Sequence, residues 1–350
     1  MQDSLFADDA APPEPKPTRP VRPRAGAAAI TPVPPDPRHL ELAAALPPTL
    51  RLGGSSWNYP GWKGLVWEGE HEAALLSRRG LPAYAEHPLM RTVCLDRSFY
   101  RALTASQYAG LAAQVPADFR FVVKAPSMVT DAQVRGENGK ALQPNPLFLN
   151  AELAVQEFAV PALEGLGRRL GVLVFQLSPL PPPLLADVPA LLQRIEALLL
   201  ALPSLQAAAP DAVVALEVRD PALLVRPLAD MLKHCGATFC LGLHAKMPPI
   251  AQQLPLLRAL WPGPLVCRWN LNPVNGAYGY EDAEKRYEPF DRIQDPDPQT
   301  RELLARVVRA TTAAGYPAYV TISNQAEGCA PLSIASLAED IVALPAGAAA

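Results

Sequence analysis

Short apolar runs alternate with longer helix-like segments along the chain from residue 49 onward. The runs are rich in Val, Leu, Phe and Tyr, and most are continuous rather than interrupted by polar residues. Continuous runs of this kind are typical of parallel strands that are buried on both faces of a sheet. The eight predicted strands are Leu50–Gly54, Thr92–Asp96, Arg120–Ala125, Gly171–Leu177, Ala212–Arg219, Thr238–Leu243, Leu265–Asn270 and Ala318–Ser323.

The segments between these strands carry start and stop signals of helices. Asp187 can cap one of them, and Gly236 follows another. The eight predicted helices are Ala73–Arg79, Ala105–Val115, Ala151–Leu163, Asp187–Leu202, Leu223–Cys235, Ile250–Leu260, Gln299–Ala314 and Pro331–Val342.

Eight strand–helix alternations over roughly 290 residues match the size of a (β/α)8 barrel. A doubly wound open sheet is the alternative, and it usually carries a glycine-rich phosphate-binding turn after its first strand. Residues 53–57 read Gly-Gly-Ser-Ser-Trp here, which is not the GxGxxG pattern. We therefore predict an α/β fold, a TIM-like (β/α)8 barrel, over residues 49–345.

Proline marks a different segment at the start of the chain. The 350 residues include 41 prolines, more than twice the usual share of about 5%. Twelve of these prolines lie within residues 1–48, together with many alanines and charges of both signs. A segment of this composition cannot form a packed core. We predict that residues 1–48 are a disordered, Pro/Ala-rich N-terminal tail.

Charge and cysteine content restrict the partners and the compartment. A net charge of −3 gives no global basic field toward nucleic acid or an anionic membrane, although a local basic patch is compatible with it. No run of eighteen apolar residues is present, and the first ten residues lack the features of a secretory signal. The five cysteines form no CxxC pair. We expect reduced thiols, no structural zinc site, no membrane span and a cytoplasmic protein.

Seven sequence blocks at the ends of predicted strands carry a resemblance to a known family. They are residues 52–62 (LGGSSWNYPGW), 98–101 (SFYR), 119–126 (FRFVVKAP), 174–179 (VFQLSP), 217–221 (EVRDP), 267–270 (CRWN) and 319–328 (YVTISNQAEG). In this order, the blocks resemble the largely bacterial domain-of-unknown-function family number 72 over about residues 50–342. The resemblance implies a barrel and no settled reaction.

The chain departs from that family's pattern at several polar positions. The family's E-x-N is Cys94-Leu95-Asp96 here, and a histidine of the seventh strand is Asn270. The paired asparagines of the eighth strand are Ser323-Asn324, and a later histidine is Cys329. A metal or acid–base site at those family positions is therefore not carried over. We predict a divergent member, assign no metal site and leave the cofactor unknown.

Polar residues at the C-terminal strand ends are the candidate site, because functional groups of (β/α)8 barrels lie there. Lys124, Arg219 and Arg268 are cations suited to a phosphate or carboxylate, so we predict an anionic ligand. Glu217 and Asp96 are the candidates for proton transfer or water activation. Further candidate ligand-binding residues, by hydrogen bonding or ring stacking, are Gln176, Asn270, Asn324, Trp57, Tyr59 and Tyr100.

A structural interpretation of the same residues stands beside this one. Glu217 and Arg219 lie two apart on one predicted strand and therefore share a face. They can pair with Arg268 or Lys124 in an interior salt-bridge network that fills the barrel mouth without chemistry.

The start of the chain offers a candidate docking peptide at residues 2–6 (Gln-Asp-Ser-Leu-Phe). It resembles the pentapeptide by which bacterial replication and repair proteins bind the sliding clamp. Gln2 would hydrogen-bond at the rim of a pocket, and Leu5 and Phe6 would enter it as apolar anchors. A disordered tail would then act as a tether for the barrel.

Three functions are compatible with the sequence. The first is a hydrolase that acts on a phosphate-bearing substrate, with Glu217 or Asp96 as general base. The second is a nucleic-acid-associated repair or replication accessory protein, docked on the sliding clamp through residues 2–6. The third is a non-catalytic binder of an anion or another small molecule.

Overall fold

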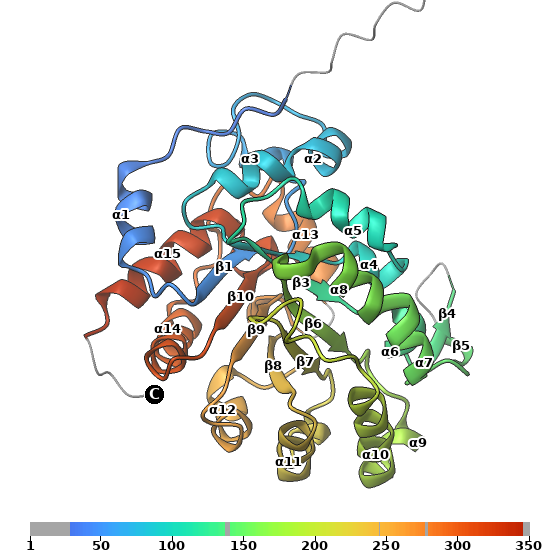
Figure 1. The fold of residues 1–350 in the computed structure, drawn as a ribbon. Helices are drawn as coiled ribbons and strands as arrows, with labels where there is room; N and C mark the ends of the chain where they lie inside the picture. The colour runs from blue at the N-terminus through green and yellow to red at the C-terminus, as the bar shows by residue number, and fades with distance from the viewer. Residues whose placement is uncertain (1–28, 137–140, 245, 277–278, 346–350) are drawn as a thin grey trace, which may run out of the picture.

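Eight parallel strands close into a barrel in the computed structural model of the chain, which describes residues 29–136, 141–244, 246–276 and 279–345 (Figure 1). Neighbouring strands follow the order β1-β2-β3-β6-β7-β8-β9-β10, and β10 pairs with β1 to complete the circle. The predicted barrel is thereby confirmed. The strands are β1 Leu50–Gly54, β2 Thr92–Leu95, β3 Arg120–Lys124, β6 Leu170–Gln176, β7 Val213–Glu217, β8 Thr238–Leu243, β9 Leu265–Trp269 and β10 Ala318–Ile322.

Helices cover the outside of the barrel (Figure 1). Within the described residues, none of them is long and apolar enough to cross a bilayer. They are α1 Pro37–Ala45, α2 Ala73–Arg79, α3 Leu81–Glu86, α4 Arg97–Tyr100, α5 Ala105–Ala112, α6 Ser127–Thr130, α7 Ala151–Ala154, α8 Val160–Leu166, α9 Pro182–Leu185, α10 Val188–Leu200, α11 Arg226–His234, α12 Ile250–Ala259, α13 Tyr280–Tyr287, α14 Pro298–Ala313 and α15 Ala330–Ala343. The short antiparallel pair β4 Gln133–Arg135 and β5 Ala141–Pro144 stands apart from the barrel.

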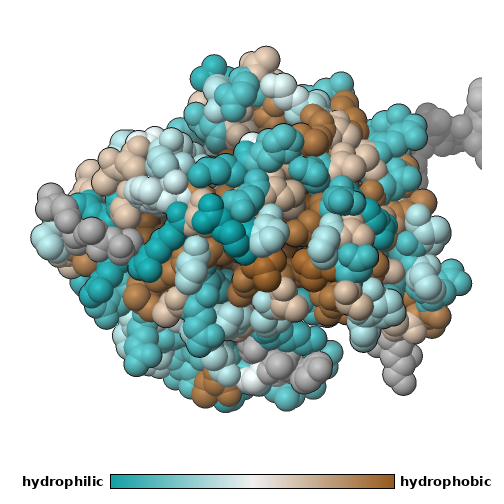
Figure 2. All heavy atoms as spheres, turned by 90° about the horizontal axis from the view of Figure 1, so that it is seen from below, coloured by the Kyte–Doolittle hydropathy of each residue, from teal (hydrophilic) through white to brown (hydrophobic). Residues whose placement is uncertain are grey.

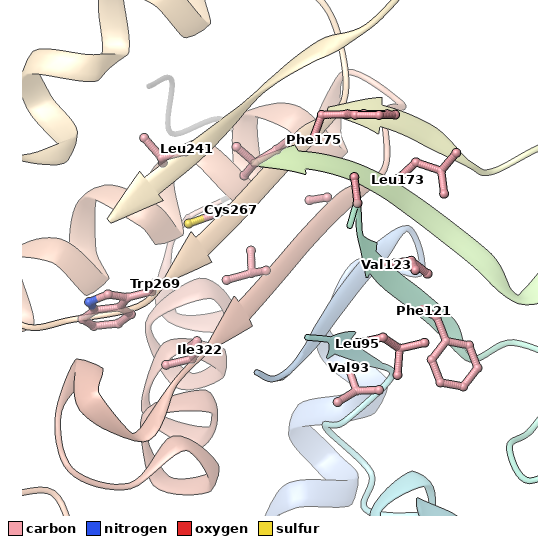
Figure 3. Close-up of a cluster of buried hydrophobic side chains, with 14 of the residues drawn as sticks. Val93, Leu95, Phe121, Val123, Leu173, Phe175, Leu241, Cys267, Trp269 and Ile322 are labelled. Atoms are coloured by element: carbon pink, nitrogen blue, oxygen red, sulfur yellow. The ribbon is translucent and has the colours of Figure 1, made fainter. Parts of the chain in front are cut away.

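The barrel strands bury both of their faces, which explains their continuous apolar runs. Val93, Phe121 and Phe175 belong to the large core between strands and helices (Figure 3). Cys94 and Val122, the next residues along β2 and β3, belong instead to a smaller cluster inside the barrel. Successive side chains of a strand point to opposite faces, so two cores require apolar residues at every position.

The folded part of the chain begins before residue 48, where the predicted tail was expected to end. Residues 1–28 lie outside the described residues. Residues 37–45, assigned to the tail, form helix α1, and Ile30 is buried in the main core. The Asp36 side chain caps α1 by accepting from the Arg38 backbone N–H, and Pro37 fits the first turn, where no N–H is needed. Arg38 also pairs with Glu339 of α15 at 2.5 Å, so α1 is part of the fold.

Candidate functional site

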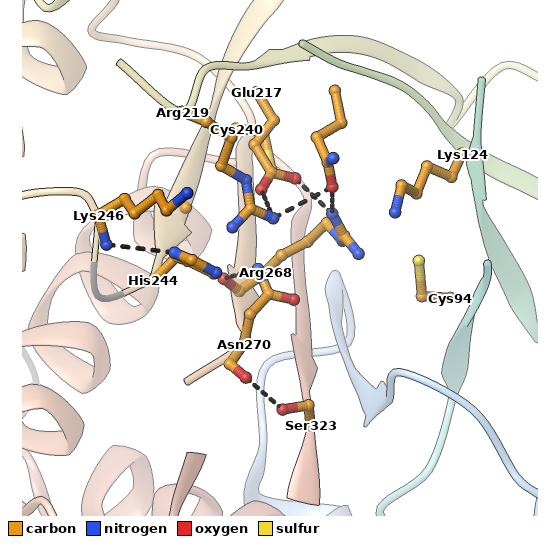
Figure 4. Close-up of polar contacts among 12 residues, drawn as sticks. Cys94, Lys124, Glu217, Arg219, Cys240, His244, Lys246, Arg268, Asn270 and Ser323 are labelled. Carbon is orange, nitrogen blue, oxygen red and sulfur yellow. Dashed lines mark hydrogen bonds and ion pairs between the residues drawn. The ribbon is translucent and has the colours of Figure 1, made fainter. Parts of the chain in front are cut away.

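Glu217 lies at the centre of a polar cluster at the C-terminal end of the barrel (Figure 4). It is the last residue of β7 and is completely buried. Its Oε2 accepts a hydrogen bond from Arg268 Nη1 at 2.5 Å, and its Oε1 lies 2.6 Å from Arg219 Nη2. The carboxylate therefore holds two guanidinium groups from different segments.

Gly242 of β8 provides the room that this carboxylate occupies. A Cβ atom built on Gly242 would lie 3.3 Å from Glu217 Oε1 and 3.4 Å from its Cγ. The first distance is tighter than most contacts of a Cβ atom, and the second lies at the short end of ordinary van der Waals contact. A glycine at this position of the neighbouring strand lets Glu217 turn into the barrel.

Gln176 and Asp96 extend the cluster around Arg268. Gln176 Oε1, at the end of β6, accepts from Arg268 Nη1 at 2.9 Å and from Arg219 Nη2 at 3.1 Å. Asp96 Oδ1, just after β2, lies 3.2 Å from Arg268 Nη2. These contacts fix the guanidinium of Arg268, whose side chain is only 3% exposed.

Lys124 completes the cluster from the end of β3. Its Nζ lies 3.8 Å from Asp96 Oδ1 and 4.0 Å from the centre of the Phe99 ring. A cation over an aromatic face is attracted by the ring quadrupole. No described residue accepts a hydrogen bond from this ammonium group, so its donors are free to face the mouth.

The cluster keeps its two carboxyl groups ionised. Burial alone would raise the pKa of Glu217, but Arg219 and Arg268 together lower it below its usual value. Burial likewise opposes ionisation of Asp96, and Lys124 and Arg268 lower its pKa. The three cations exceed the two carboxylates of the cluster by one positive charge.

The two carboxylates differ in their access to the mouth. The Asp96 side chain is 39% exposed, whereas that of Glu217 is not exposed at all. A group must reach the proton that it abstracts. Asp96 is therefore the better placed of the two predicted catalytic residues, and Glu217 is placed to position the arginines.

Neighbouring cysteine and histidine side chains are neutral at pH 7. Burial, followed by the charge of Asp96, raises the pKa of the Cys94 thiol to about 12, and burial raises that of Cys329 to about 12. Nucleophilic chemistry requires a thiolate, so neither thiol is suited to it. Burial and then Arg219 lower the pKa of His244, which follows β8, to about 4.

Two predicted ligand-binding residues lie outside the mouth. The Trp57 ring is 3% exposed, and its Nε1 donates to the Leu76 carbonyl, so it is not available for stacking. Asn324 is fully buried, and its Oδ1 accepts from Trp62 Nε1 and from the Ala330 backbone N–H. Both side chains make packing contacts within the protein, and a role of either one in ligand binding stays a prediction.

The other predicted contacts are distributed around the rim. Tyr59 packs between Trp62 and Phe290, with ring centres 4.8 and 5.4 Å away, while Tyr100 is 81% exposed. Asn270 is nearly buried, and its Nδ2 donates to the carbonyl of Arg268 on the same chain segment. Tyr59, Tyr100 and Asn270 stay candidate contacts.

Two residues near the site were not predicted. Phe99 lies under Lys124. Burial, followed by electrostatic interactions with Tyr59 and Asp96, raises the pKa of Tyr280 on α13. Tyr280 follows β9 by eleven positions, so no strand-end rule identifies it. Among the described residues, no three His, Cys, Asp or Glu side chains form a group able to hold a metal ion.

Comparisons with known proteins agree with this fold. The model of the family "Protein of unknown function DUF72" matches residues 51–348. A solved DUF72 family protein from Enterococcus faecalis is similar in structure, with a TM-score of 0.54, 17% identity and coverage of 85% of this chain and 96% of that one. Another from Thermotoga maritima has a TM-score of 0.52, 16% identity and coverage of 84% and 98%. No curated protein matches. The family match, which spans most of the chain and the whole barrel, shows that the chain belongs to DUF72.

Proposed function

We propose that the barrel mouth binds a phosphate-bearing ligand. The observation that carries this proposal is the excess of cationic groups around Glu217. Arg219 uses Nη2 for both Glu217 and Gln176, and no described residue accepts from its Nη1. In this proposal, Arg219 Nη1 and Lys124 Nζ would both donate to the anion, because guanidinium and ammonium groups suit phosphate oxygens.

The chemical role that fits this site is hydrolysis of a phosphate ester, with Asp96 as the proton acceptor. Water would attack phosphorus and give one proton to Asp96, while the ester P–O bond breaks and the leaving alkoxide takes a proton from solvent. Asp96 would then release its own proton to solvent, which restores the site. Lys124 and Arg219 would stabilise the charge on the phosphoryl oxygens. Glu217 would hold both arginines rather than touch the substrate.

Binding is tested by calorimetry with inorganic phosphate and phenyl phosphate at low salt. We expect saturable binding, and at least a tenfold loss of affinity in Lys124→Gln, because one charge-assisted contact is removed. Lys233→Gln, which removes an exposed lysine of α11, is the matched control. Absence of phosphate binding, or equal affinities of Lys124→Gln and the control, would refute the proposal.

Catalysis is tested separately by release of phosphate from a panel of phosphomonoesters. Asp96→Asn is expected to abolish turnover while phosphate still binds. Binding of phosphate without turnover of any ester by the parent protein would instead support the non-catalytic binder.

A second candidate is a nucleic-acid-associated protein, for which the favourable observation is the exposed Tyr100 ring. An exposed aromatic ring near cations can stack on a base of a single strand. Binding of short single-stranded DNA that weakens with salt and with Tyr100→Ala would support it, and indifference to DNA at low salt would exclude it.

Docking on the sliding clamp belongs to this second candidate and rests on residues 2–6, which lie outside the described residues. Fluorescence anisotropy of a labelled peptide covering residues 1–12 tests it against a bacterial sliding clamp. Saturable binding that is lost with Leu5→Ala and Phe6→Ala would support docking, and binding unaffected by both changes would refute it.

A further inference from the structure

An apolar groove lies at the end of the barrel opposite the candidate mouth. It has a volume of about 670 Å³ and lies between helices α12 and α14. Its floor includes Thr238 and Leu265, the first residues of β8 and β9. Because the strands run from this end toward the mouth, ligands in the two places would not touch each other.

The shape of the groove follows from residue size on the two helices. Small residues of α14 and its C-terminal end, including Ala310 and Ala313, leave space, and Leu257 and Trp261 form the facing wall. Trp261 is 46% exposed, which is unusual for so large an apolar side chain. Figure 2 shows hydrophobic surface exposed among polar residues on the side of α10, α11 and α12.

Two arginines give this apolar groove a positive charge. Arg258 of α12 and Arg309 of α14 both line it. Among the described residues, neither guanidinium has an acidic partner, in contrast to Arg306 of α14, which pairs with Glu302. An apolar wall with two cations among its lining residues matches a ligand that has an apolar chain and an anionic head.

We propose that this groove binds a fatty-acid anion of medium chain length. The carboxylate would lie between Arg258 and Arg309, and the alkyl chain would lie along Leu257 and Trp261. The volume is within the range of about 300 to 1,000 Å³ that is usual for small-molecule sites. Each added methylene that becomes buried is expected to strengthen binding about threefold to fourfold until the groove is filled.

Calorimetry of the full chain with hexanoate, octanoate and decanoate, each below its micelle concentration, tests the proposal. We expect saturable binding that strengthens along this series. Decyltrimethylammonium, which has an alkyl chain one carbon longer than that of decanoate and a cationic head, is expected to bind at least tenfold more weakly. Equal affinities for the two head groups, or absence of saturable decanoate binding, would overturn the proposal.

Variants locate the ligand within the molecule. Arg309→Gln is expected to weaken decanoate binding at least fivefold, and Ala313→Trp to abolish it by filling the groove, because position 313 is exposed and has room for a larger side chain. Arg306→Gln on the same helix is the matched control and is expected to change nothing. Circular dichroism and the unfolding temperature confirm that each variant is folded. Loss of binding in Lys124→Gln but not in Arg309→Gln would place decanoate at the mouth and overturn the proposal.

Two other occupants of the groove are distinguished in the same experiments. A dimer in light scattering that Ala313→Trp dissociates, without decanoate binding, would identify the groove as an interface between copies. Decanoate binding that appears only after removal of residues 346–350 would make that segment the occupant. Either result would overturn the proposal.

Discussion

Glu217 at the end of β7 and Glu327 after β10 are both completely buried glutamates, yet their surroundings differ. Glu217 holds two guanidinium groups, and three cations outnumber the carboxylates around it. Glu327 Oε1 accepts from Arg301 Nη1 at 2.5 Å and from the Asp297 backbone N–H at 2.6 Å. Arg301 is shared with a second carboxylate, Asp340, at 3.4 Å.

The difference shows that burial of a carboxylate does not by itself identify a functional site. Glu327 joins α14, α15 and the end of β10 in a cluster in which acids outnumber the cation. Glu217 belongs to a cluster with spare positive charge and with an exposed neighbour, Asp96. Charge balance and access, rather than burial, distinguish a site for an anion from a structural ion pair.

The largest expected effect comes from removing each glutamate in turn. Glu217→Ala removes the carboxylate that pairs with two buried guanidinium groups, and Glu327→Ala removes the closer of the two carboxylates that pair with Arg301. Each is expected to lower the free energy of unfolding by about 3 to 5 kcal/mol. Added phosphate should recover part of this loss in Glu217→Ala only, because an anion can replace the missing carboxylate at the mouth. Urea unfolding with and without phosphate measures both effects. Equal recovery in the two variants would remove the distinction between the clusters.

A smaller loss of stability is expected when a methyl group added on β8 crowds the Glu217 side chain. Gly242→Ala places a methyl group against Glu217 and should cost about 1 to 3 kcal/mol, as overpacked sites do. Gly110→Ala on helix α5 meets no atom within 4 Å and should stabilise by about 0.5 to 1 kcal/mol. Thermal unfolding of the pair checks the prediction. A Gly242→Ala protein as stable as its parent would show that Glu217 can move freely.

The pH dependence of stability allows a comparison of His244, which lies near the mouth, with His87, which lies outside it. The pKa values of His244 and His87 are both lowered from 6.5 to about 4, chiefly by burial. Between pH 4 and 6.5 the unfolded chain therefore binds more protons, so stability rises with pH in this window. His244→Gln and His87→Gln should each make the rise shallower in urea unfolding. Bound phosphate should raise the pKa of His244 but not that of His87. It should therefore reduce only the part of the rise in stability that comes from His244.

The smallest effect is expected at an exposed pair. Arg226 and Asp230 of α11 pair at 2.8 Å with side chains 70% and 57% exposed. Arg226→Ala should change stability by at most about 0.5 kcal/mol, because solvent screens such pairs. Urea unfolding measures the change. A loss as large as that of Glu217→Ala would show that burial and charge balance do not determine how much an ion pair stabilises this fold.

The sequence was sufficient to predict the barrel because strands buried on both faces produce continuous apolar runs, as β6 Leu170–Gln176 does. It also predicted which charges meet at the mouth, since strand ends in a closed parallel barrel share one edge. Side-chain direction was harder to predict. Trp57 turns inward because the Leu76 carbonyl accepts its N–H, a contact between segments that no local pattern indicates. Helix α1 was not predicted because the segment was assigned to the tail on its proline content. The helix-start signal of Asp36 followed by Pro37 was therefore not recognised.

Closure of the barrel by β1 and β10 has a consequence for the order in which the protein can mature. Leu50 of β1 pairs with Ala318 of β10, so the first strand to be synthesised can complete its pairing only after the last strand has been made. Until then β1 and β9 each present an open edge, a template for pairing with other chains. Contacts between such distant residues also slow folding. A nascent chain interrupted before residue 318 would therefore be prone to aggregate. The final tenth of the sequence, by supplying β10, covers both open strand edges and prevents such aggregation.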